Sequence, residues 1–255
     1  MPHNLIRKLE GFTRLSGEDK GALERLAQSV QQVGADRDII HEGDSPEHVN
    51  LILDGWACRY KTLEDGRRQI ISFFMPGDIC DTHVFVLREM DHSIGTLTPV
   101  RLVQIPRDEL LDLTDRHPRI MRALWWETLV TAAIQREWTV SLGQRSGIER
   151  LAHLFCELFL RLRTVGLTDG DTCPLPITQN EIAEAMGQTS VHVNRTLQEM
   201  RNAGLIILKS KRLTIPDMDR LQRVALFNPN YLHLDREGAH LDANDQEPTV
   251  PSLRH

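Results

Sequence analysis

The chain has 255 residues, of which 40% are hydrophobic and 26% are charged, so most of it should fold, and its length suits two modest domains better than one. The net charge of −6 argues against a nucleic-acid partner globally, yet residues 187–212 hold five basic residues and one acidic residue, and DNA responds to the local field. No apolar run reaches the roughly 18 residues of a membrane span, and no secretory signal is visible. Four cysteines without a CxxC motif favour a reducing cytoplasm over a disulfide framework or a zinc knuckle.

The first third of the chain changes from helical to strand-like character. Residues 1–33 predict short amphipathic helices, one of them starting at Ser16, which Glu18 and Asp19 follow. Glycines then recur every nine to twelve residues between short β-rich runs at 49–53, 56–60, 69–75 and 102–105. The pair Asp65-Gly66 predicts a hairpin turn. Many short strands with regular turns indicate an antiparallel barrel or jelly roll.

From about Pro118 the apolar period becomes helical, and no further Pro or Gly occurs until Gly143. The apolar set is too wide for one face of a helix, which predicts a helix buried on two sides. We expect one side to cover the barrel and the other to meet a second copy in a parallel coiled coil, with a buried helix of a monomer as the alternative. The seam is predicted at Met121, Leu124, Thr128, Gln135, Trp138 and Leu142.

Two further helices and a hairpin follow. Ser146 should cap a helix over 147–163, residues 164–176 should form a loop, and a helical pair should begin at Thr178. Thr178 and Glu181 form a capping-box pattern, Gly187 suits a tight turn, and Thr189 can cap the next helix, whose buried stripe is Val193, Leu197 and Met200. This pattern predicts a helix-turn-helix, against the alternative of a solvated helical hairpin.

The outward face of the second helix and the following hairpin carry the chemistry for DNA. Arg can pair with guanine and Asn with adenine in the major groove, while Thr and Ser near a helix N-terminus can reach phosphates. Residues 205–216 predict a hairpin whose basic tip fits a wing on the sugar-phosphate backbone. The predicted DNA-binding residues are Thr178, Thr189, Ser190, Val191, His192, Asn194, Arg195, Gln198, Lys209, Lys211 and Arg212.

A barrel, a long helix and a winged helix-turn-helix in this order resemble the Crp/Fnr family of bacterial transcription regulators over residues 15–216. The resemblance implies an α+β protein: a β-roll sensor domain with N-terminal helices (1–116), a dimerisation helix (117–143) and a winged helix-turn-helix (144–217). A C-terminal extension (218–255) follows, and its composition from about Asp235, rich in Asp, Asn, Pro and His, predicts that it is partly disordered. The resemblance also implies that Arg195 ends the recognition pattern, whereas Ser190 and Val191 replace an Arg and a Glu of the cyclic-AMP branch. A different half-site follows from that departure.

The nucleotide-binding cassette of the family does not match this chain. By resemblance its ribose-binding Glu falls at about Thr82, its phosphate-binding Arg-Ser becomes His92-Ser93, and its adenine-contacting pair falls near Gln135-Arg136. An anion there lacks an Arg fork, so we expect no cyclic-AMP dependence. His92 and Arg136 remain the candidates for an anionic effector, and we expect no bound cofactor.

Other readings of the sequence carry less weight. The first cysteine is Cys58, which disfavours an N-terminal iron–sulfur cluster. Cys80 with His83 or His92 can in principle hold haem or a metal, but a buried Cys with surface histidines is the simpler interpretation. No nucleophile–base motif, phosphate loop or HExxH argues for an enzyme. The runner-up is therefore a ligand-sensing module that regulates a protein partner, whereas the leading hypothesis is a homodimeric DNA-binding regulator of a palindromic operator, with RNA polymerase contact and an unidentified small-molecule effector implied by the family.

Overall fold

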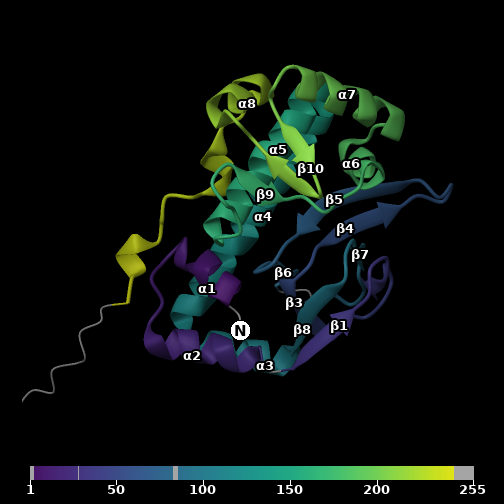
Figure 1. The fold of residues 1–255 in the computed structure, drawn as a ribbon. Coiled ribbons are helices and arrows are strands. Elements are labelled where there is room, and N and C mark those ends of the chain that lie inside the picture. Colours follow the sequence, from purple (N-terminus) through teal and green to yellow (C-terminus); the bar gives the residue numbers. More distant parts are fainter. Residues whose placement is uncertain (1–2, 28, 83–85, 244–255) are drawn as a thin grey trace, which may run out of the picture.

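The computed structural model describes residues 3–27, 29–82 and 86–243. A two-sheet roll, a long central helix and a C-terminal helical domain follow one another along the chain (Figure 1). None of the helices in these ranges is long and apolar enough to cross a membrane. The α+β class, with an antiparallel β domain followed by a long helix, is confirmed.

The roll consists of two antiparallel four-stranded sheets, in the orders β1-β8-β3-β6 and β2-β7-β4-β5. Side chains such as Leu51, Phe74 and Leu102 are buried in its core because alternate residues of each strand point inward. The predicted turn joins β4 to β5, where the Leu63 N–H donates to the Arg67 carbonyl at 2.8 Å. The strands are β1 (Val30–Val33), β2 (Asp38–Ile40), β3 (His48–Asp54), β4 (Ala57–Thr62), β5 (Arg68–Phe74), β6 (Ile79–Cys80), β7 (Ser93–Thr96) and β8 (Val100–Pro106).

The N-terminal prediction holds for two helices and then is wrong. Helices α1 (His3–Glu10) and α2 (Gly17–Leu26) form, and Ser16 caps α2 in a capping box with Asp19. Residues 30–33, however, form strand β1, which pairs antiparallel with β8. The segment forms a strand because the edge of β8 supplies hydrogen-bond partners for its backbone. The local sequence does not reveal that such an edge is nearby.

Three helices follow the roll: α3 (Arg107–Arg116), α4 (Pro118–Gln144) and α5 (Gly147–Thr164). The proline of α4 occupies the first turn, where no helical N–H is lost, and Ser146 caps α5 with Glu149 as predicted. One side of α4 is buried, while Trp125, Leu129 and Val140 are about half exposed or more. The long helix therefore keeps an apolar stripe uncovered within one chain.

The C-terminal domain contains α6 (Gln179–Met186), α7 (Ser190–Asn202), α8 (Met218–Ala225) and a three-stranded sheet of β9 (Thr172–Pro174), β10 (Ile207–Lys209) and β11 (Arg212–Thr214). Strand β9 lies inside the segment that we expected to be entirely loop. It forms because β11 offers it a free edge, with Cys173 opposite Leu213.

A segment that we call the C-terminal strap, residues 226–243, runs from α8 back to the N-terminal helices (Figure 1). It contains η2 (Pro229–Leu232) and η3 (Ala239–Leu241). The Gly238 N–H donates to the Phe12 carbonyl at 3.1 Å, and the Ala243 N–H donates to the Arg14 carbonyl at 3.0 Å. The expectation of disorder from about residue 235 is therefore wrong up to residue 243, because these contacts satisfy the backbone; residues 244–255 lie outside the described ranges.

The strap covers a buried histidine of α5, which predicts a specific acid sensitivity. His153 is 1% exposed and stacks on Tyr231 at 5.7 Å between ring centroids, and burial, aided by Arg145, lowers its pKa from 6.5 to about 3. Below pH 6.5, His153 binds a proton in the unfolded chain but not in the folded one. The free energy of unfolding therefore has its full value above that pH and falls as the pH drops toward 3.

We expect His153→Phe to remove about 1.4 kcal/mol per pH unit from the slope of unfolding free energy between pH 6 and pH 4. Urea unfolding at several pH values measures this slope, and the exposed His41 supplies the control His41→Phe. An unchanged slope in the His153 variant would show that the histidine is protonated in the folded protein.

Candidate functional site

The two helices α6 and α7 meet through the tight turn that the sequence predicts. The Thr178 hydroxyl accepts from the Glu181 N–H at 3.2 Å, and the Glu181 carboxylate accepts from the Thr178 N–H, which completes the capping box. Gly187 has φ of 61°, in the left-handed region that glycine adopts at little cost. Thr189 caps α7 by accepting from the His192 N–H at 3.2 Å.

The buried stripe of α7 is also as predicted. Val193, Leu197 and Met200 are at most 1% exposed and pack in the core with Ile182 and Ala185 of α6. Because this buried stripe fixes the rotation of α7 about its own axis, the opposite face points to solvent. The helix-turn-helix is therefore present with its polar face accessible.

The exposed face of α7 brings together most of the predicted base-reading residues. Ser190, Val191, Arg195 and Gln198 are exposed, while His192 and Asn194 are half-buried. Gln198 donates to the Asn194 side-chain carbonyl at 3.0 Å. In turn Asn194 donates to Gln179 Oε1 at 2.8 Å, so a polar chain crosses from α7 to the start of α6. Gln179 is a member of this surface that the sequence analysis missed, although its place directly after the cap Thr178 is a signal for it.

Arg195 lies along the surface of α7 in the free protein. One of its terminal nitrogens is 2.8 Å from His192 Nδ1, and its Nε is 3.9 Å from a Glu199 carboxylate oxygen. The side chains of Arg195 and Glu199 are 67% and 57% exposed, so water screens this pair strongly. The guanidinium is thus available to a base or a phosphate.

The wing is a two-residue hairpin between β10 and β11. Ser210 and Lys211 have φ of 51° and 57°, the left-handed pair of a type I′ turn, and Lys209 pairs with Arg212 across it. Lys209, Lys211 and Arg212 are all exposed, as predicted. A groove of about 380 Å³ separates the wing from α6 and α7, and Arg201, which the sequence analysis did not assign to the site, lines it with Thr178.

The roll touches the helix-turn-helix directly. Arg68 of β5 lies 3.4 Å from a Glu184 carboxylate oxygen of α6, and Gln69 donates to the Ala185 carbonyl at 3.2 Å. These contacts connect the hairpin β4–β5 to the helix that positions α7. The roll is therefore joined directly to the helix on which α7 packs.

Inside the roll, a polar cluster that is buried except for Asp91 contains the predicted effector residue His92. His92 is 8% exposed, and its Nε2 lies 2.9 Å from an Asp81 carboxylate oxygen while its Nδ1 lies 2.6 Å from Asp91. Arg59 pairs with the same Asp81 and stacks over the Phe74 ring at 5.2 Å. Burial opposes the ionisation of Asp81, yet its contacts with His92 and Arg59 lower its pKa.

The other predicted pocket residues do not join this cluster. Thr82 is buried beside Asp81, and Ser93 accepts from the Glu42 N–H at 2.9 Å. Gln135 donates to the Ile71 carbonyl of β5 at 2.5 Å, and Arg136 is exposed. Within the described ranges no hydrogen bond or ion pair links His92 to Gln135 or Arg136. Sequence reasoning missed Arg59 and Asp81, since nothing local marks two residues 22 positions apart as partners.

A metal or haem site built on cysteine and histidine was the alternative interpretation of the sequence. The described residues include no group of three or more His, Cys, Asp or Glu side chains that could hold a metal ion. The thiols of Cys58, Cys80, Cys156 and Cys173 are free and buried. Burial raises the pKa of Cys80 well above 9, which disfavours the thiolate that a metal ligand requires. His92 is buried rather than on the surface as expected, because Asp81 and Asp91 hold it in place, and His83 lies outside the described residues.

Two residues of the predicted dimer seam are buried within their own chain. Leu124 and Trp138 are 1% and 5% exposed and pack inside their own chain, where Trp138 meets Phe73 and donates to Glu157. Met121 and Gln135 are half-buried, whereas Thr128 and Leu142 are exposed. The apolar stripe left open on α4 runs through Trp125, Leu129 and Val140, none of which is among the predicted positions. A wide apolar set does not reveal which part of it the chain itself covers.

A two-sheet roll joined through a long helix to a winged helix-turn-helix defines a class of DNA-binding regulators with a sensor domain. The cyclic nucleotide-binding domain model matches residues 30–117, and the Crp-like helix-turn-helix domain model matches residues 149–224. The chain belongs to the Crp/Fnr family and is a transcription regulator with a DNA-binding helix-turn-helix.

Relatives of known role support the assignment along most of the chain. The transcriptional activator protein FnrL of Cereibacter sphaeroides is 26% identical over 224 residues, which cover 85% of this chain and 88% of that protein. The nitrogen fixation regulation protein FixK of Bradyrhizobium diazoefficiens is 28% identical over 222 residues, covering 86% and 91%. The solved structure of FixK2 from Bradyrhizobium japonicum has the same fold, with a TM-score of 0.69 at 22% identity, covering 77% of this chain and 96% of that one.

Proposed function

We propose that this regulator acts as a homodimer that places two α7 helices in successive major grooves of a palindromic operator. The observation that carries the proposal is the exposed polar face of α7, flanked by a cap that can bind phosphate and by a basic wing. In this arrangement Arg195, Asn194 and Gln198 read base edges, while Thr178, Thr189 and the wing residues hold the backbone. Two copies of α7 about 34–36 Å apart would match one helical turn of DNA.

The experiment that tests this role is selection of bound DNA from a random pool, followed by a salt titration of the selected sequence. We expect a palindromic sequence and a steep linear fall of log affinity with log salt, since each neutralised phosphate contributes about −0.9 to the slope. A slope near zero, or no enriched sequence, would contradict the proposal and favour the regulator of a protein partner.

The open stripe on α4 is proposed as the dimer interface. Trp125, Leu129, Arg136 and Val140 recur at spacings of four and seven residues, which places them along one line of the helix. Large apolar side chains in such a line are usually covered by a partner. A second copy of α4 related by a two-fold axis covers the stripe and also brings the second α7 to the DNA.

We expect Leu129→Glu to convert the dimer to a monomer, because the two-fold axis would place like charges against each other in an apolar seam. Light scattering coupled to size-exclusion chromatography measures the mass, and Leu111→Glu, at an exposed leucine of α3, is the matched control. A dimer that persists in the Leu129 variant at micromolar concentration would overturn this interface.

We further propose that cyclic AMP is not the effector. In the roll, the guanidinium of Arg59 already has a carboxylate partner in Asp81, and His92 lies between Asp81 and Asp91. A cyclic phosphate would have to approach the carboxylate of Asp81, which is 17% exposed, and like charges repel strongly where little water screens them. Calorimetry with cyclic AMP should show no saturable heat. Regulation of transcription in the cytoplasm, with contact to RNA polymerase, is the setting that the family suggests.

A further inference from the structure

A cavity lies outside the roll, where the sensor domain, the long helix, the C-terminal domain and the strap meet. It has about 70 Å³ of free volume, and its walls come from α1, the segment from β5 to β6, α4, α5 and the strap. A water molecule needs roughly 10–15 Å³ by this measure, so the cavity has room for roughly five water-sized groups. Apolar side chains such as Phe74, Val130 and Leu232 form much of the wall.

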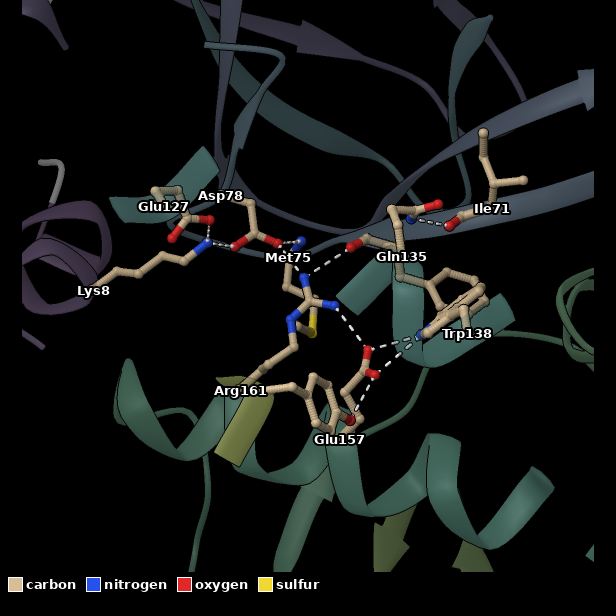
Figure 2. A network of polar contacts seen from close by, with 11 residues as sticks. Lys8, Ile71, Met75, Asp78, Glu127, Gln135, Trp138, Glu157 and Arg161 are labelled. Atoms are coloured by element: carbon tan, nitrogen blue, oxygen red, sulfur yellow. Dashed lines mark hydrogen bonds and ion pairs between the residues drawn. The ribbon is translucent and has the colours of Figure 1, made fainter. Parts of the chain in front are cut away.

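One end of this cavity holds an ion network that Figure 2 shows. Lys8 of α1 contacts both Asp78 and Glu127, and Arg161 of α5 lies 2.9 Å from Asp78 and 3.4 Å from Glu157. All five side chains are at most 16% exposed. Three carboxylates therefore face two cations, so the network carries one surplus negative charge when every group is ionised.

The surplus falls on Glu127. Asp78 accepts from Lys8, from Arg161 and from the Met75 N–H at 2.8 Å. Glu157 accepts from Arg161, from Trp138 and from the Tyr231 hydroxyl at 3.0 Å. The carboxylate of Glu127 instead contacts only Lys8, and its Oε2 has no hydrogen-bond partner within the described part of the chain.

A second buried polar atom, on a residue that lines the cavity, also lacks a partner. The indole N–H of Trp126 is buried and, among the described residues, donates to no acceptor. The ring itself is held by stacking on Phe12 at 5.5 Å between centroids. Buried polar atoms without partners are rare, and two on neighbouring residues of one cavity wall point to a molecule that supplies both an N–H donor and an acceptor.

We propose that this cavity is a binding site for a small organic cation, whose ammonium group pairs with Glu127 Oε2 and whose acceptor group takes the Trp126 N–H. The cation neutralises the surplus charge, and its aliphatic part covers the apolar wall. This site is separate from the polar cluster inside the roll, since none of Arg59, Asp81 and His92 lines it.

Burial raises the pKa of Glu127, although Lys8 acts against this rise, so ionising this carboxylate costs more free energy than usual. A cation bound beside Glu127 favours the ionised carboxylate and lowers its pKa, so binding should become tighter as the pH rises through the pKa of Glu127. The other ionisable groups that face the site are Lys8, Asp78, Arg161 and His233. Of these, Lys8, Asp78 and Arg161 have pKa values shifted toward their charged forms.

The test is calorimetry on the full chain with three small probes of similar size: 3-amino-1-propanol, propylamine and 3-hydroxypropionate. We expect saturable one-to-one binding of 3-amino-1-propanol, at least tenfold tighter than that of the anion. At pH values near the pKa of Glu127, its heat should change with the ionisation enthalpy of the buffer, because binding of the cation releases a proton from that carboxyl group. Equal or stronger binding of 3-hydroxypropionate, or no binding of the amine, would overturn the site.

Two variants assign the contacts. Glu127→Gln keeps the shape but not the charge, so it should weaken both amines at least tenfold and abolish the proton release, whereas Glu109→Gln, at an exposed glutamate of α3, should change neither. Trp126→Phe keeps the stacking but not the N–H, so it should weaken 3-amino-1-propanol and leave propylamine unchanged. Circular dichroism at the assay temperature confirms that each variant is folded, and unaltered amine binding by folded Glu127→Gln contradicts the proposal.

The role of the site as an effector site rests on the proposed DNA-binding function, and the two are tested separately. Because its walls join the sensor domain to the C-terminal domain, we expect saturating 3-amino-1-propanol to change affinity for the selected DNA about fivefold or more. A protein that binds the DNA but no amine refutes this inference alone. A protein that binds the amine but selects no DNA refutes the proposed function alone.

Discussion

Arg161→Ala is expected to lower the free energy of unfolding by about 3–5 kcal/mol, because it removes one partner from a buried ion network and leaves the others uncompensated. Arg161 joins Asp78 at 2.9 Å, Glu157 at 3.4 Å and the Phe73 carbonyl at 3.0 Å. These partners belong to the roll and to α5, so one side chain holds two domains together (Figure 2). The acidic excess would rise from one charge to two with every group ionised.

Equilibrium unfolding in urea measures the loss, and Arg163→Ala is the matched control. Arg163 lies two residues further along α5 and is exposed, so its removal should stay within about 0.5 kcal/mol. A loss below about 1 kcal/mol in the Arg161 variant would mean that water enters the network and screens it. That outcome would also weaken the charge count on which the cation site depends.

Arg195→Ala is expected to cost about 1–3 kcal/mol of discrimination at one base pair of the operator, which is about 5- to 150-fold in relative affinity. The side chain is exposed on α7, and among the described residues its polar contacts are with His192 and Glu199 of its own helix, so its removal should leave the fold intact. Lys211→Ala, at the tip of the wing, should instead weaken all sequences alike and reduce the magnitude of the salt slope by about 1.

Competition binding with operators that vary one base pair at a time separates these two effects. Arg116→Ala, which removes an exposed ion pair of α3, serves as the control and should bind every operator like the unaltered protein. If Arg195→Ala lost affinity uniformly, the guanidinium would contact phosphate rather than a base. If Lys211→Ala changed the base preference, the wing would read sequence directly.

Local sequence signals proved reliable for features that span a few residues. The caps at Ser16, Ser146, Thr178 and Thr189 all form, because a hydroxyl and an N–H three residues on meet as soon as the helix begins. The glycine turn and the basic hairpin depend on similarly short chemistry. The whole helix-turn-helix, and with it the exposed face of α7, therefore followed from one continuous stretch.

Features that depend on distant residues were beyond the sequence. The strand β1 was taken for helix because its partner β8 is about 70 residues away. Arg59 and Asp81 in the roll, and Lys8 and Asp78 at the cavity outside the roll, are likewise far apart along the chain. Whether such groups pair depends on how whole helices and strands pack together, and the hydrophobic periodicity of the sequence does not predict that packing.

The sequence by itself determined the order of domains, the helix-turn-helix and the chemistry of its outer face, since hydrophobic period and capping act over one or two turns. Only the tertiary structure decided which side of α4 stays open, that the strap returns to α1 and α2, and that five charges gather around one cavity. Burial is a property of the assembled elements: the same leucine is core or interface according to what packs on it.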